Sequence, residues 1–135
     1  MTSDAQLSIM MMDKRWGSGD PKKYLHDDHF AVYDDHNYIQ YAGVAAQQDA
    51  YLRYTCQDTR SGTKPVFVGE WSLAVATDVA NDWDPTKAEN KDFYLQFWAA
   101  QVTSYEKSAQ GWVSVIVFAF SPLDNRFPLV SDASF

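Results

Sequence analysis

The chain has 135 residues, a net charge of −7 and a pI near 4.7, and 46% of its residues are hydrophobic. This length suits one small domain. Because nucleic acids and anionic membranes attract clustered Lys and Arg, the acidic balance argues against both as partners. No apolar run is long enough to span a membrane, and residues 1–16 lack the pattern of a secretory signal peptide.

Four strands and two helices are expected along the chain. Apolar runs predict strands, the first of them buried, over 7–12, 31–35, 66–72 and 112–120. Helical spacing predicts helices over 44–57 and 91–107, the second capped by Asn90. The core-facing side of this second helix is expected to comprise Phe93, Phe97, Trp98, Val102 and Tyr105.

Strands that alternate with helices predict a parallel α/β fold. In such folds the ligand site lies at the carboxyl ends of the strands. This rule places Glu70, the segment 36–38 and the residues after Phe118 on one edge of the sheet.

Glu70 is the first candidate functional residue, because the strand-like run KPVFVGEWS ends with a carboxylate between a glycine and a tryptophan. A carboxylate at a buried strand end needs a partner or a role, so Glu70 is either catalytic or an ion-paired strand terminus. His36 and Tyr38 lie two residues apart, so on an extended strand both point to one face and both reach one carboxylate. The alternative is a solvated His36 and a packed Tyr38.

Other clusters carry weaker predictions. Residues 26–36 contain three His and four Asp, which suits a metal site, but their spacing fits no closed metal motif and we predict no metal. The segment 16–21, WGSGDP, lacks the remaining features of a phosphate loop. Cys56 falls in a predicted helix and is expected to be buried or disulfide-bonded. Four tryptophans either stack on sugar rings or belong to the core: Trp16, Trp71, Trp83 and Trp112.

Several stretches, taken in order, resemble the second half of glycoside hydrolase family five. They are MMDKRWGSGDP, YDDHNY, VFVGEWSLA and NKDFYLQFWAAQVTSYEKSAQGW, within residues 7–112. The resemblance is closest to the fungal secreted β-1,6-glucanases, followed by the exo-β-1,3-glucanases. It implies a partial (β/α)₈ barrel, approximately strands five to eight with their helices.

The resemblance also implies a retaining glycoside hydrolase that acts on β-glucan. Glu70 matches the family's nucleophile, His36 and Tyr38 match its His-x-Tyr segment that contacts nucleophile and sugar, and Trp71 and Trp16 are assigned to substrate binding. No metal or organic cofactor is implied. The family is secreted, which implies an extracellular or cell-wall location for the full-length protein.

Two departures from the family limit what we expect of the chain by itself. The Asn-Glu-Pro motif that carries the family's acid/base glutamate is absent, and half of a barrel that needs about 250 residues leaves open sheet edges. Residues 1–112 are interpreted as the C-terminal half of the family's catalytic domain, and residues 113–135, which diverge from the family, as translated intron sequence or the product of a wrong gene model. We therefore expect little or no activity. The alternative is a non-catalytic carbohydrate-binding half-barrel that self-associates through its open edges.

Overall fold

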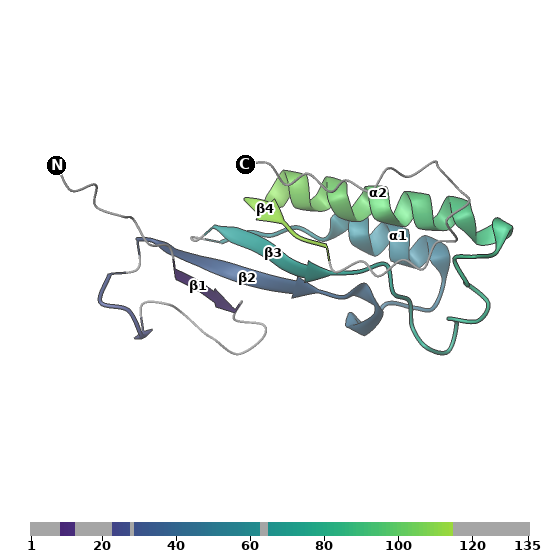
Figure 1. Cartoon of the computed structure of the whole chain (residues 1–135), viewed down its shortest axis with the longest axis horizontal. Coiled ribbons are helices and arrows are strands. Elements are labelled where there is room, and N and C mark those ends of the chain that lie inside the picture. The colour runs from purple at the N-terminus through teal and green to yellow at the C-terminus, as the bar shows by residue number, and fades with distance from the viewer. Residues whose placement is uncertain (1–8, 13–22, 28, 63–64, 115–135) are drawn as a thin grey trace.

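The computed structural model describes residues 9–12, 23–27, 29–62 and 65–114 (Figure 1). Three sequence predictions therefore lie outside the described residues: the loop 16–21 with Trp16, the strand beyond residue 114, and nearly all of the divergent tail. None of the helices in the described ranges is both long and apolar enough to cross a membrane.

The described residues form a parallel α/β unit. Its strands are β1 (Ile9–Met12), β2 (Ala31–Asn37), β3 (Val66–Trp71) and β4 (Gly111–Trp112). Its helices are α1 (Gln48–Gln57) and α2 (Lys91–Ser108), with short 3-10 helices η3 (Ile39–Tyr41) and η4 (Ala88–Asn90). The strands pair in the order β1-β2-β3-β4, and every pairing is parallel. The predicted alternation of strands and helices, and the parallel sheet that it implies, are confirmed.

The two helices lie side by side on one face of the sheet (Figure 1). The core forms between this face and the helices. Val68 and Trp71 of β3 pack there with Tyr51 of α1 and with Phe97 and Tyr105 of α2. Burial of these large side chains is the main favourable contribution to folding of this unit.

Strand β1 differs from the prediction of a buried strand. Ile9 is 45% exposed and Met10 is 51% exposed. The strand lies at the edge of the sheet and pairs only with β2 among the described strands. The apolar run therefore predicted the strand correctly, but the prediction that the strand is buried was wrong for these two residues.

Helix α1 begins at Gln48, so Val44 lies in the preceding loop and the helix is four residues shorter at its start than predicted. Cys56, on this helix, is an exposed free thiol, which corrects the expectation that it is buried or disulfide-bonded. Asn90 occupies the N-cap position of α2 as predicted, but its side chain makes no capping hydrogen bond. Its amide instead donates to the carbonyl oxygens of Asp82 and Asp84 and so ties down the preceding loop.

The buried face of α2 is more polar than its apolar pattern predicts. Trp98 is 40% exposed, whereas Gln101 and Ser104 are buried. The Gln101 amide donates to the carbonyl oxygen of Ser72, and the Ser104 hydroxyl donates to that of Asp58. Both polar residues are buried because they satisfy loop carbonyls that follow α1 and β3.

A buried ionic cluster lies beneath β2, between the sheet and the helices. The guanidinium of Arg60 lies 2.8 Å from the Asp35 carboxylate and 3.0 Å from that of Asp58, and stacks 4.6 Å from the centre of the Tyr105 ring. The Asn37 amide donates to Asp58 and to the Tyr105 hydroxyl. The Arg60 and Asp35 side chains are both 1% exposed, so each charge depends on the other for compensation.

Replacing Arg60 with Ala is expected to destabilise the chain by about 3–5 kcal/mol, because the buried Asp35 carboxylate loses its ion-pair partner and Asp58 loses one of its two contacts. Arg53→Ala is the matched control. Its pair with Asp49 joins residues i and i+4 of α1 and is 64% and 65% exposed, so its loss should cost no more than about 0.5 kcal/mol. Urea unfolding of both variants measures the difference. Equal losses of stability would contradict the importance of the buried cluster.

Tyr94 is expected to make stability fall at alkaline pH. Burial, with the nearby Asp84 charge as a smaller cause, raises the pKa of Tyr94 to about 12. Above the ordinary tyrosine pKa of 10.0 the unfolded chain therefore loses this proton while the folded chain keeps it. The unfolding free energy then decreases as pH rises.

The Tyr94→Phe variant lacks this proton, so its unfolding free energy should depend less steeply on pH between about pH 9 and pH 11. Urea unfolding at both pH values tests this expectation. Parallel pH dependences of the variant and the unaltered chain would refute it.

Candidate active site

The site lies where β2 and β3 end, on the sheet face opposite the helices. Along β2, Asp35 and Asn37 point to the helices and are buried, whereas Asp34 and His36 alternate with them on the other face. This second face is the one that the helices leave open, and we call it the open face.

A bulge in β3 brings Glu70 to this open face. Asp35 pairs with Val68, but the next residue of β2, His36, pairs with Glu70, so Gly69 is the extra residue of a β-bulge. Val66 and Val68 are buried against the helices, and regular alternation would bury Glu70 with them. The extra residue reverses the alternation, so Glu70 turns to the open face and Trp71 turns into the core.

The same reversal corrects the assignment of Trp71 to substrate binding. Its side chain is 0% exposed and packs against Tyr105 and Trp112, with ring centres 5.2 and 5.6 Å apart. The indole is therefore on the helix side of the sheet and presents no face to a ligand. Trp71 therefore belongs to the core, which was the alternative in the sequence analysis.

The structure brings Glu70, His36 and Tyr38 together, as the sequence predicted. The Tyr38 hydroxyl donates a hydrogen bond to Glu70 Oε2 at 3.0 Å, and His36 Nδ1 lies 3.2 Å from the same oxygen. Both contacts are to Oε2. Within the described residues Glu70 Oε1 accepts no hydrogen bond, and the side chain is 42% exposed. One carboxylate oxygen is thus anchored and the other remains available.

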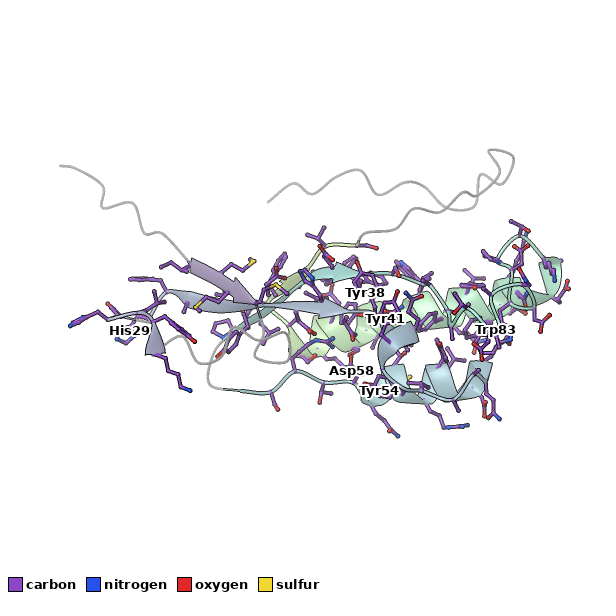
Figure 2. The ribbon with its side chains drawn as sticks, turned by 90° about the horizontal axis from the view of Figure 1, so that it is seen from below. His29, Tyr38, Tyr41, Tyr54, Asp58 and Trp83 are labelled. Atoms are coloured by element: carbon purple, nitrogen blue, oxygen red, sulfur yellow. The ribbon has the colours of Figure 1, made fainter. Side chains whose placement is uncertain are left out.

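Tyr38 lies directly after β2, in extended backbone at the start of η3. Its ring lies close to that of Tyr41, so the residue before η3 and the last residue of η3 are in edge contact (Figure 2). Burial, followed by the hydrogen bond to Glu70 and the Glu70 charge, raises the pKa of the Tyr38 phenol above its usual 10.0. The phenol therefore remains a hydrogen-bond donor to Glu70 throughout the neutral range.

Two further residues of the site were missed in the sequence. His36 Nε2 is hydrogen-bonded to Asp34 Oδ2 at 3.3 Å, and the Asp34 carboxylate lies over Gly69, where an added Cβ would lie 2.9 Å from Asp34 Cγ. Both had a signal. Asp34 precedes His36 by two residues and so shares its face, and a glycine inside a strand is typical of a bulge or a close approach.

Two other features are separate from this site. A hollow lined by Pro65, Val66 and Gln110 lies at the opposite end of β3 from Glu70. Within the described ranges, no group of three or more His, Cys, Asp and Glu side chains has the arrangement of a metal site.

Comparison with known proteins identifies relatives that match most of the chain. The chain is 50% identical over 109 residues to the probable glucan endo-1,6-beta-glucosidase B of Neosartorya fischeri, and 49% identical over 109 residues to that of Aspergillus fumigatus. It is 46% identical over 116 residues to the glucan endo-1,6-beta-glucosidase B of Emericella nidulans. The chain is homologous to a segment of these proteins. The predicted resemblance to the fungal β-1,6-glucanases is thus confirmed.

The alignments cover 79–84% of this chain but only 26–28% of these glucan endo-1,6-beta-glucosidases. The chain therefore spans about a quarter of the length of the curated relatives that it matches. No family model matches the chain, and no solved structure matches it.

Replacing Glu70 with Gln is expected to lower the pKa of Tyr38, because the negative charge and the carboxylate acceptor are removed. The pKa should remain above 10.0, since burial is the larger cause and is unchanged. The ¹³Cζ shift of Tyr38, followed as a function of pH in both proteins, measures this difference. Identical titrations would show that the phenol and the carboxylate do not interact.

Proposed function

We propose that the chain carries the nucleophile of a retaining β-glucan hydrolase, with Glu70 in that role. The observation that carries the proposal is the asymmetric anchoring of Glu70, in which Oε2 accepts the Tyr38 hydroxyl and lies beside His36, while Oε1 accepts no hydrogen bond in the described residues. A retaining glycosidase needs a carboxylate held in one orientation that attacks an anomeric carbon from one side. The names of the homologous proteins support a β-1,6-linked glucan as the substrate.

In the first step, Glu70 Oε1 would form an ester bond to the anomeric carbon as the bond from that carbon to the leaving oxygen breaks. A second carboxyl group, about 5–5.5 Å from the nucleophile, gives the leaving oxygen its proton. Water then attacks the same carbon and releases Glu70, and it returns a proton to that second group. The net reaction consumes one water per glycosidic bond.

His36 and Tyr38 would stabilise the nucleophile rather than exchange protons with the leaving group. Tyr38 donates to Glu70 Oε2 and so holds the carboxylate in one orientation. When the ester forms at Oε1, the negative charge of Glu70 is lost, and the same hydrogen bond remains on the carbonyl oxygen of the ester. The anchored oxygen therefore needs no rearrangement between the two steps.

The parallel sheet with helices on one face supports the further proposal that this chain is a piece of a (β/α)₈ barrel of glycoside hydrolase family five. In a barrel the open face of the sheet would become the interior, and Glu70 would lie at its carboxyl-terminal end. We also propose that the complete protein acts outside the cell on cell-wall glucan, as the family resemblance implies.

The acid/base group is the missing part of the site. Within the described residues no second carboxylate contacts Glu70 directly, since Asp34 is separated from it by the His36 ring. Loss of general acid catalysis costs about 10²–10⁴-fold in rate, so turnover of the polysaccharide by this chain should be weak or undetectable. A substrate whose leaving group needs no proton avoids this limit.

The test uses 2,4-dinitrophenyl β-gentiobioside, a β-1,6-linked disaccharide with such a leaving group. Dinitrophenolate release by the purified chain is expected to exceed the spontaneous rate, and Glu70→Gln should abolish this excess. Glu89→Gln, an exposed carboxylate of η4, is the matched control and should behave like the unaltered chain. Equal release by the chain and its Glu70→Gln variant would contradict the proposal.

Because no second carboxylate contacts Glu70 in the part of the chain that the structure describes, a second candidate is also favoured, a non-catalytic β-glucan-binding unit that self-associates along its sheet edges. Co-sedimentation with insoluble β-1,6-glucan, without any release of dinitrophenolate, would support this candidate. Binding accompanied by release that depends on Glu70 would support the hydrolase.

A further inference from the structure

We propose that Asp34 is a positioning residue, which accepts the Nε2–H of His36 and thereby directs Nδ1 of the same ring at Glu70. This inference rests on the proposed function of Glu70, because a positioned imidazole matters only if Glu70 reacts. It adds to the site one carboxylate that makes no direct contact with the nucleophile in the described residues.

The two contacts of the His36 ring are not equivalent. Nε2 lies 3.3 Å from Asp34 Oδ2 in the alignment of a hydrogen bond, whereas Nδ1 lies 3.2 Å from Glu70 Oε2 as an ion-pair contact only. Glu70 Oε2 already accepts the Tyr38 hydroxyl proton. A neutral imidazole has one N–H to give, and Asp34 is the better placed acceptor.

The placement of Asp34 is built into the bulge. Gly69 has no side chain, and the Asp34 carboxylate fills that space, where an added Cβ would overlap Oδ1. Asp34 Oδ1 is buried and has no hydrogen-bond partner in the structure, and the side chain as a whole is 20% exposed. A carboxylate with one desolvated, unpaired oxygen is costly, so its remaining hydrogen bond to His36 is the contact that compensates for its position.

The consequence for the site is a fixed division of roles between the ring nitrogens. With Nε2–H given to Asp34, Nδ1 is the nitrogen that faces the nucleophile, and any second proton on the ring must enter there. That proton would be donated to Oε2, the oxygen already anchored by Tyr38. The titratable groups that contact His36 in the described residues are Asp34 and Glu70.

The experiment measures directly which nitrogen of the His36 ring carries the proton. The chain is labelled with ¹⁵N-histidine in a His26→Gln, His29→Gln background, which removes two exposed histidines and leaves His36 as the single signal. Long-range ¹H–¹⁵N spectra then show which ring nitrogen carries the proton. We expect the neutral ring to be mainly the Nε2–H form.

Asp34→Asn should reverse this preference. The new amide can donate to Nε2, and the ring proton then moves to Nδ1, where Glu70 accepts it. The Nε2–H form should fall from the majority to the minority of the neutral ring. An Asp34→Asn variant that retains the Nε2–H form as the majority would overturn the proposal.

Gly69→Ala disturbs the same contact without changing Asp34. The backbone of Gly69 is not in the left-handed region, so alanine fits the chain, and only the Asp34 carboxylate must move. We expect a loss of the hydrogen-bonded Nε2–H signal, and an unchanged ring spectrum would count against the proposal even if Asp34→Asn failed to fold. Asp49→Asn, an exposed carboxylate on α1, is the matched control and should leave His36 unaffected.

The ring spectra distinguish this inference from the proposed function. If the ring responds as expected but dinitrophenolate release does not depend on Glu70, Asp34 positions His36 in a site that is not hydrolytic. If dinitrophenolate release depends on Glu70 while the His36 ring spectrum is unchanged by Asp34→Asn and Gly69→Ala, the proposed function stands and the positioning role is wrong.

Discussion

The β-bulge at Gly69 is the constraint on which the rest of the site depends. Strand side chains alternate between two faces, and β3 must both bury Val68 against the helices and present Glu70 on the opposite side. One extra residue achieves both, since it reverses the alternation of side chains between the two faces near the end of the strand. A regular strand would bury Glu70 in the apolar core and expose Trp71, at a cost to both packing and charge.

The opposite face of β2 explains how the site stays in place. Asp35 and Asn37 reach Arg60, Asp58 and Tyr105 on the helix side. The residues that alternate with them, Asp34 and His36, are therefore fixed on the open face by a cluster on the helix side of the sheet. A buried ionic cluster adds little net stability when compared with an apolar core, but it is costly to disrupt. It holds one register of the strand, and that register aligns His36 with Glu70.

Much of this could be predicted from residue pattern. The apolar run before Glu70 predicted β3, the spacing of His36 and Tyr38 predicted a shared face, and alternation of strands and helices predicted the parallel sheet. Two kinds of feature could not be predicted that way. Gln101, Ser104 and Arg60 are polar residues whose burial depends on partners far away in the chain. The orientation of Trp71 depends on the β-bulge at Gly69, and the two-residue periodicity of a strand does not predict a bulge.

The most direct measurement of the central claim is chemical trapping of the nucleophile. A 2-deoxy-2-fluoro β-glucosyl fluoride forms its ester without acid assistance and hydrolyses slowly, so mass spectrometry of the digested chain can locate the label. The account predicts an ester on Glu70 in the unaltered chain and no ester in the Glu70→Gln variant. A folded chain that is labelled at another carboxylate, or that gains no label at all, would contradict it.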